Sequence, residues 1–489
     1  MNAPKTKPSS AVATIGSGAQ TMILALFMGM LAMFMSAAHA AVPGITGASP
    51  APVFQLTASA GRISQPDGNS IYSWGYGCNT GFNPTSIPTS IGGTCSTMQL
   101  PGPTLIVHQG DQVTVTLANG LPAAAGKTSI VFSGFQVTAS GGTNGLLTQE
   151  AAPGFPVTYT FAASKPGTYA YYSGTQPDLQ IEMGLYGAVV VLPTTAPVGC
   201  AQGDFSLATS AYGIPQSCYD REYLFQFSEM DSRIHEQAEA QVLAGLSQIS
   251  VASEPYQPNY FLINGRSMPD DMDTNFASNY PNQPYNANPH MHPRDLVLMR
   301  VIGQGRWQHP FQFHGNHARV LARDGNLLLA QNSSSQLAGP LLFTIPTVSG
   351  QSVDAIFTWT GQGLNWDVYG VYDGASNTHK CNGLDTASAG FDPVTQEYCP
   401  DHNKPIPVTP PDPNIVAQGL WYGGTPYLGI QGSNLTPLPP GLTKQNTDAG
   451  YAYMWHSHNE REITTNDVFP GGMMMMLIID PPSSAISEM

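Results

Sequence analysis

Histidine spacing is the first chemical signal in this sequence. His456 and His458 are separated by one residue, and His309 and His314 lie in a second histidine-containing segment. Residues i and i+2 of a β-strand point to the same side of a sheet, so such a pair can present two imidazoles to one ion. Neutral imidazole is a good ligand for copper and zinc. Such histidines could hold a divalent metal, or they could equally be core or interface histidines that are held by hydrogen bonds and carry no metal.

Three other groups of residues offer weaker chemistry. Met473–Met476 could supply soft thioether ligands, but the run continues into Leu477–Ile479, which favours a buried terminal strand. His290 and His292 lie among Asn and Pro residues, where we expect an exposed turn. Acidic residues near His458 could complete a mixed nitrogen and oxygen site, or simply form a solvated loop. These are Glu460, Glu462 and Asp467.

The composition favours many short strands and excludes some functions. Only 10% of the 489 residues are charged and 42% are apolar, with 51 Gly and 42 Pro. The net charge is −15 and no basic run occurs, so we expect no nucleic-acid partner, because phosphate binding needs clustered Lys and Arg. No G-x-S-x-G motif and no phosphate-binding loop is present, which argues against hydrolase and nucleotide-binding functions.

The N-terminus has the pattern of a secretory signal. Lys5 and Lys7 precede the apolar run Met22–Met35, and Ala38–Ala40 forms an A-x-A cleavage site. The apolar run is shorter than the roughly 20 residues that a membrane span needs. We therefore expect residues 1–40 to be removed on export to the periplasm or the extracellular space, which leaves a mature chain without a membrane segment.

Six cysteines agree with an oxidising compartment. Neighbours in the sequence lie 17, 18 and 18 residues apart, and this regularity suggests three local disulfides, although other pairings are open. The pairs are Cys78 with Cys95, Cys200 with Cys218, and Cys381 with Cys399. Thiolate metal ligands are less favoured, since no C-x-x-C occurs and no cysteine adjoins the histidines.

Two series of strands position these residues. Asp111–Leu117 and Pro156–Phe161 alternate apolar and Thr side chains, which is typical of strands with one buried face. Gly184–Pro193 contains a run suited to a fully buried strand. A helix is predicted at Arg233–Leu246 from the i+4 spacing of its apolar residues. The second series comprises Tyr223–Phe225, Phe261–Asn264, Leu296–Ile302, Ala355–Trp359 and Met473–Ile479. The two series look like two copies of one β-sandwich type.

Several segments resemble the multicopper oxidases. Pro101–Leu105 with Gly110–Asp111 resembles the opening of the first cupredoxin domain in that family. His309–Gly315 and Trp455–His458 resemble the domain that ends such enzymes. Two domains rather than three make the chain similar to the two-domain laccases. The resemblance implies an all-β fold of tandem cupredoxin-like Greek-key β-sandwiches, and for intact members a type 1 copper that feeds electrons to a three-copper cluster.

The expected organisation follows from the strand series and this resemblance. After the signal peptide at residues 1–40, an N-terminal cupredoxin-like domain spans residues 41–197. A disulfide-stapled linker spans residues 198–220. The C-terminal cupredoxin-like domain spans residues 221–489 and contains a long irregular insertion at about residues 375–449.

Most of the copper ligands that the resemblance implies are replaced. The four histidines of the family's first domain stand here as Val131, Ser133, Tyr172 and Gly174. In the second domain Gln312 replaces one histidine, Ser457 the type 1 cysteine, and Glu462 the last histidine. Because type 1 copper depends on a Cu–thiolate bond, no such centre is expected.

Four histidines remain at matching positions: His309, His314, His456 and His458. By family position, His314 and His456 approach one type 3 metal position, His458 approaches the other, and His309 with Glu462 flanks the type 1 position. We expect these residues to be the metal ligands, and we assign no catalytic residue and no ligand of another cofactor. The expected cofactor is copper, below the content of a four-copper oxidase, or another divalent metal.

Two functions follow from these residues. The first is an exported multicopper-oxidase-like protein with a degenerate copper site, metal-binding or structural rather than a standard laccase. The alternative is an active copper-dependent oxidoreductase that uses the remaining histidines with substitute or partner ligands. Resemblance to two-domain laccases also implies a homotrimer, but an identical partner brings the same Val131, Ser133, Tyr172 and Gly174 and would repair nothing.

Overall fold

The computed structural model describes most of the chain from Val42 onward, and the residues from Ala40 form one compact unit. The predicted signal peptide and most of the predicted insertion lie outside the described residues. No helix within the described part is long and apolar enough to cross a membrane. The described residues are 42–87, 94–194, 197, 200–202, 205–206, 209–362, 390–392, 396–399, 424–428, 449–482 and 484–486.

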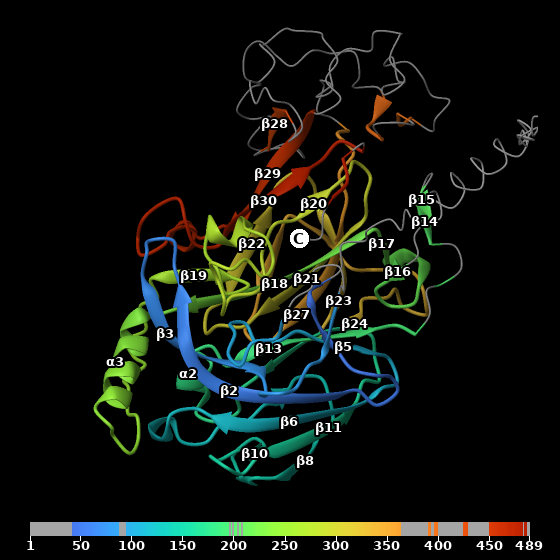
Figure 1. Ribbon diagram of the computed structural model, residues 1–489. Helices are drawn as coiled ribbons and strands as arrows, with labels where there is room; N and C mark the ends of the chain where they lie inside the picture. The colour runs from blue at the N-terminus through green and yellow to red at the C-terminus, as the bar shows by residue number, and fades with distance from the viewer. Residues whose placement is uncertain are drawn as a thin grey trace, which may run out of the picture. The chain divides into compact units, whose positions relative to one another are not determined.

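Two sheets form the N-terminal domain, drawn in blue to green in Figure 1. The first has the order β3 (Ser70–Cys78), β2 (Val53–Ser64), β6 (Gln112–Gly120), β11 (Val157–Ala162), β8 (Thr138–Gly141). The second has the order β4 (Thr85–Ile87), β1 (Gly44–Thr46), β5 (Leu105–His108), β13 (Tyr186–Leu192), β12 (Gly167–Tyr172), β7 (Val131–Phe132). In β6 and β11 the predicted alternation is confirmed, because Val113, Val115 and Leu117 are buried opposite Phe161, Tyr159 and Val157.

Two further sheets form the C-terminal domain. The first has the order β19 (Tyr260–Ile263), β18 (Arg221–Met230), β21 (Val297–Gly303), β27 (Ser352–Phe357), β23 (Ala318–Arg323), β24 (Asn326–Leu327), with β25 (Leu341–Leu342) also on β23. The second has the order β20 (His290–Met291), β30 (Met474–Ile479), β29 (Ala449–Ser457), β22 (His309–Phe313), β26 (Thr344–Thr347), with β28 (Gly424–Leu428) also on β29.

The two domains repeat one topology. Strand β2 pairs with β6 in parallel, as β18 does with β21, and each pair continues into an antiparallel neighbour, β11 or β27. In the facing sheets β5 pairs with β13 in parallel and β20 with β30 likewise, and each is followed by two antiparallel strands. The prediction of an all-β chain with two sandwiches of one type is therefore confirmed.

One helix of some length interrupts the strands. Helix α3 (Ser232–Leu243) begins at Asp231, whose side chain accepts a hydrogen bond from the Arg233 backbone N–H at 3.2 Å. Its buried Ile234 and Ala238 join the core of the N-terminal domain. The helix predicted at Arg233–Leu246 is thus present but ends earlier, and Leu246 is exposed.

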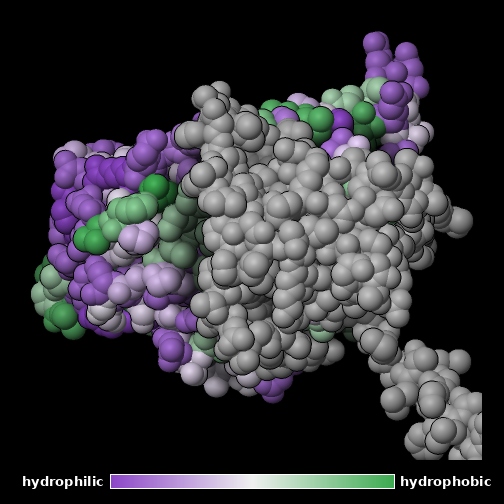
Figure 2. Space-filling view, turned by 90° about the horizontal axis from the view of Figure 1, so that it is seen from above, coloured by the Kyte–Doolittle hydropathy of each residue, from purple (hydrophilic) through white to green (hydrophobic). Residues whose placement is uncertain are grey.

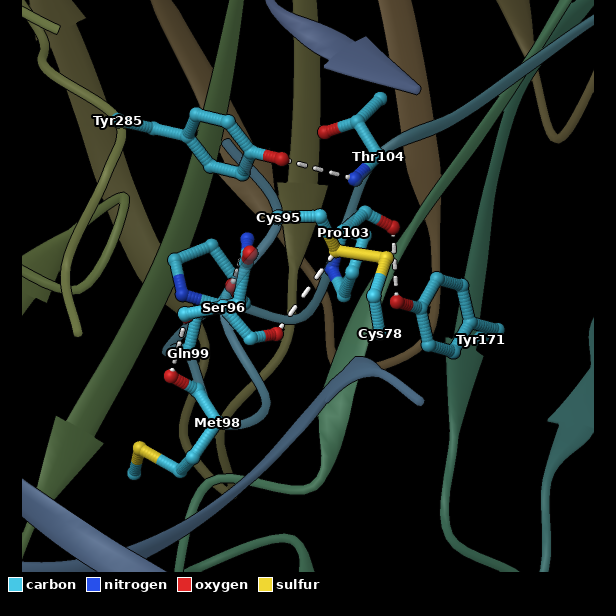
Figure 3. The surroundings of a disulfide bond; sticks show 10 residues. Cys78, Cys95, Ser96, Met98, Gln99, Pro103, Thr104, Tyr171 and Tyr285 are labelled. Atoms are coloured by element: carbon cyan, nitrogen blue, oxygen red, sulfur yellow. Dashed lines mark hydrogen bonds between the residues drawn. A yellow bond between two sulfur atoms is a disulfide. The ribbon is translucent and has the colours of Figure 1, made fainter. Parts of the chain in front are cut away.

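Disulfides tie loops in both halves of the chain. Cys78 and Cys95 form a bridge beside Pro103, whose carbonyl accepts a hydrogen bond from the Tyr171 hydroxyl at 2.8 Å (Figure 3). Cys200 and Cys218 form the second bridge. Cys399 is disulfide-bonded too, but the predicted partner Cys381 lies outside the described residues.

A buried polar contact joins the two domains. Arg300 on β21 donates from Nε to Glu222 at 2.9 Å and from Nη1 to the Thr168 hydroxyl of β12 at 2.9 Å. Thr168 in turn donates to Asp354 of β27 at 2.6 Å. Because buried charges must be paired, these groups fix how the sheet of β12 lies on the sheet of β21 and β27.

Two of the weaker histidine and methionine signals are now resolved. The exposed turn predicted at His290 and His292 is wrong: β20 pairs with β30, and His290 Nδ1 lies 2.6 Å from the Asp480 carboxylate. The buried strand predicted at Met473–Met476 is confirmed, since Met473 and Met475 are fully buried. Apolar side chains that stay on the surface form separate patches among polar residues in the coloured part of Figure 2.

Candidate metal centre

Two of the four predicted ligands meet at the end of a strand pair. Strands β22 and β29 are antiparallel, with Phe313 opposite Trp455 and Gln312 opposite His456. His314 follows β22 directly, and this register brings its Nε2 to 3.1 Å from the Nε2 of His456. Both side chains are nearly buried, with 9% and 7% of their residues' surfaces exposed.

The contacts of His456 fix which nitrogen carries its proton. Its Nδ1 lies 2.7 Å from the backbone carbonyl oxygen of Ser457, which can only accept a hydrogen bond, so Nδ1 is the donor. In the neutral ring, Nε2 then has a free lone pair that faces His314. Burial lowers the pKa of His456 below its usual 6.5, and nearby His458 lowers it further. The ring is therefore neutral near pH 7 and able to bind a cation.

The spacing of this pair fits a metal ion. Two nitrogens that each lie about 2.0–2.1 Å from a tetrahedral or octahedral ion are about 2.9–3.4 Å apart, and the observed separation falls in that range. The predicted third ligand is near the pair but exposed: the ring centroid of His458 is 5.6 Å from that of His456, against 5.2 Å between the rings of His314 and His456, and 57% of its side chain is exposed. No preformed group of three or more His, Cys, Asp or Glu ligands occurs among the described residues.

His309 lies apart from this pair and contacts carboxylates. Its Nε2 is 2.9 Å from Glu229 of β18, and its Nδ1 is 2.9 Å from Glu462. Burial disfavours the charged ring, but the two carboxylates outweigh burial and raise the pKa of His309 to about 9. The structure thus separates His309 from the other predicted ligands.

The type 1 copper that the resemblance implies does not fit these residues. Ser457 occupies the position of the thiolate, and its hydroxyl donates to the Glu462 carboxylate. Both ring nitrogens of His309 face acids, so neither offers a lone pair to copper. The acidic group predicted beside His458 is also dispersed, because Glu460 and Asp467 are mostly exposed while Glu462 is buried against His309.

The N-terminal domain has an equivalent strand end without imidazoles. There β12 pairs with β7, and Tyr172 is opposite Val131 as His456 is opposite Gln312. The Ser133 hydroxyl donates to the Tyr172 hydroxyl at 3.2 Å, in the place of the His314–His456 contact. Gly174 lies against Val131, whose Cγ2 would be 2.7 Å from a Cβ added at residue 174.

These contacts bear on the family's three-copper cluster. The four replaced positions do converge, which agrees with their assignment from sequence, but they are filled by a methyl group, a hydroxyl pair and a glycine. Half of the imidazoles that such a cluster needs are therefore absent, and the residues present do not fit it.

Glu229 was missed by sequence reasoning. It is the acid on Nε2 of His309, and its side chain is fully buried near the end of a strand whose other residues are almost all buried too. The one available signal was a carboxylate on a strand with buried neighbours, because buried acids need a partner. The identity of that partner, 80 residues away, depends on the sheet arrangement.

Comparisons with known proteins match part of the N-terminal domain to one family. The family described as multicopper oxidase matches residues 93–196. A copper-containing nitrite reductase of Pseudomonas chlororaphis is 34% identical over 96 residues, which is 19% of this chain and 25% of that protein. The multicopper oxidase MCE of Talaromyces pinophilus is 35% identical over 98 residues, 19% of this chain and 15% of that protein. The chain thus spans a quarter or less of the length of these two relatives.

Solved structures give longer but weaker matches. The multicopper oxidase mgLAC has a TM-score of 0.48 at 15% identity, with 89% of this chain and 87% of that chain covered. The copper nitrite reductase from Nitrosomonas europaea has a TM-score of 0.45 at 12% identity, with 90% and 98% covered. Residues 93–196 match the multicopper oxidase family, and the chain is multicopper-oxidase-like.

Proposed function

We propose that this protein binds one divalent metal ion per chain through His314 and His456, and that it is not a standard laccase. The observation that carries the proposal is the 3.1 Å separation of the two Nε2 atoms, with the other nitrogen of His456 anchored on a backbone carbonyl. A metal ion would take the place of the single proton between these nitrogens. Copper and zinc both suit two imidazoles completed by water or by His458.

Export is part of this proposal. The signal pattern at residues 1–40 supports it, as does the disulfide between Cys78 and Cys95, because such bonds persist in oxidising compartments. In the periplasm or outside the cell, an acidic protein with this pair of imidazoles would encounter metal ions directly. We assign it metal binding there rather than four-electron reduction of oxygen.

Calorimetric titration of the mature protein with Cu(II) and with Zn(II) tests the proposal. We expect one ion per chain, with binding lost in His314→Ala and in His456→Ala and only weakened in His458→Ala. His317→Ala is the matched control, because its ring stacks on Phe343 at 3.7 Å and does not face the pair. Unchanged binding by His456→Ala would sink the proposal.

The same variants distinguish metal binding from the alternative function, that of an active oxidoreductase. An active oxidoreductase would oxidise a phenolic, amine or metal-ion substrate with consumption of oxygen, and this activity would disappear in His456→Ala. A binding protein would show the titration result without turnover. Copper content near four ions per chain would contradict both readings of the site.

A further inference from the structure

The position of the type 1 copper, as the family resemblance places it, is occupied here by three charged side chains. His309 lies between Glu229 and Glu462, and each of the three side chains is at most 1% exposed. A carboxylate oxygen lies 2.9 Å from each ring nitrogen. The contact of Nε2 with Glu229 is a hydrogen bond, whereas Nδ1 and Glu462 are close without hydrogen-bond alignment. Carboxylates are acceptors, so both contacts favour a ring that carries a proton on each nitrogen.

Donors surround both carboxylates. Glu229 Oε1 accepts hydrogen bonds from the backbone N–H groups of Arg306 at 2.6 Å and Trp307 at 2.8 Å. Glu462 accepts from the Asn459 amide at 2.8 Å and from the Ser457 hydroxyl. These are the bonds that a buried anion needs, and the hydroxyl that replaces the copper thiolate has become one of the donors.

We propose that the imidazolium of His309 replaces the type 1 copper as the cation of this position, so that the C-terminal sandwich closes around an ion triad instead of a metal. The triad then has a structural function. It holds β18, β22 and the segment after β29 together, because one member comes from each of these three parts of the chain.

The triad also reaches the other domain. The Tyr256 hydroxyl lies 3.4 Å from Glu229 Oε1 and donates to Glu182 of the N-terminal domain at 2.7 Å. Glu182 also accepts from the Asp231 backbone N–H at 2.7 Å, at the start of helix α3. Loss of the triad should therefore loosen the contact between α3 and the N-terminal domain as well as the C-terminal sandwich.

The first test compares three variants in stability and in Cu(II) titration. His309→Gln leaves two carboxylates buried without their cation, which should raise the unfolded fraction in mild denaturant about 100-fold or more. Glu462→Gln removes one acid but leaves His309 paired with Glu229, so its effect should have the same sign and be smaller. Gly305→Ala is the gentler variant: it keeps all charges, but its added Cβ would overlap the Glu229 carboxylate. All three should keep the Cu(II) stoichiometry and affinity of the unmodified protein. A loss of Cu(II) binding in His309→Gln as large as in His456→Ala would overturn the proposal.

A second test needs no variant. Nitrogen NMR of protein with 15N-labelled histidine should show one ring protonated at both nitrogens near pH 7.5, and paramagnetic Cu(II) should not broaden this signal selectively. A His309 ring with one bare nitrogen, or one broadened before any other, would contradict the triad. If His456→Ala leaves metal binding intact while this ring stays doubly protonated, the proposed function fails and the triad stands.

Discussion

Imidazoles on the same strand segment differ in chemistry because their partners differ. His309 has a carboxylate at each nitrogen, so its pKa is raised to about 9 and it is a cation at neutral pH. His314, just beyond the end of β22, faces the ring of His456, whose pKa is lowered by burial. Only a neutral ring has a lone pair for a metal. The residue type was visible in the sequence, whereas the partners that decide its role were not.

The same contacts predict a stability that falls as pH rises. A histidine with a raised pKa stabilises the fold fully below about 6.5 and loses this contribution as pH rises through about 9. Burial raises the pKa of Glu182 to about 8, so the folded chain holds a proton that the unfolded chain releases near its ordinary pKa of 4.5. Both groups make the unfolding free energy decrease with pH.

We therefore expect the urea midpoint to decrease from about pH 6 to about pH 9. In Glu182→Gln the part of the decrease below about pH 8 should become smaller, because one of the two proton-linked groups is gone. Glu236→Gln, an exposed change on helix α3, is the control and should leave the profile unaltered. A midpoint that is constant or rises over this range would show that the buried groups are not protonated as proposed.

Strand pairing is conserved between the domains while the side chains at the strand ends are not. The pairing of β7 with β12 repeats that of β22 with β29, so Ser133 and Tyr172 occupy the positions of His314 and His456. The N-terminal end is packed so closely that a side chain cannot be added at residue 174 alone without a clash. A Cβ at residue 174 would lie 2.7 Å from Val131 Cγ2, closer than two carbon atoms can approach.

This packing gives a prediction for the element. Gly174→Ala should destabilise the protein by about 1–3 kcal/mol, because it overpacks the site between the strand ends. Val131→Ala in the same chain should recover part of the loss by removing the methyl groups that clash. Urea unfolding of both single variants and the double variant measures the coupling energy between residues 131 and 174. Strict additivity of the two changes would be evidence against the contact.

At the scale of the whole molecule, the fold was predictable from local patterns and the site only in part. Alternation such as that of Val113, Val115 and Leu117 reports one buried face directly, so strands and the two-sandwich arrangement followed from the sequence. The pair of His314 and His456 followed from family positions. The Glu229–His309 contact did not, because it joins different strands through three-dimensional packing that no short pattern records.

The fold as a whole should depend on its disulfides more than on metal. Both sandwich cores are formed by apolar side chains, and the position that would close around type 1 copper is closed by the ion triad. A chelator should therefore remove only the small stabilisation that a bound ligand adds, which depends on its concentration relative to its Kd. The bridge between Cys78 and Cys95, by contrast, restricts the unfolded chain at every metal concentration.

Replacement of both cysteines by serine, Cys78→Ser with Cys95→Ser, should lower the unfolding free energy by about 2–4 kcal/mol, as expected for a loop of this length. Incubation with a chelator should shift the thermal midpoint of the unmodified protein by less than this double change does. Thermal unfolding followed by circular dichroism, with and without Cu(II), makes the comparison. If chelation destabilises the protein more than loss of the disulfide, a metal would have to be part of the folded core. Binding of one ion at the His314–His456 pair could not account for a loss of that size.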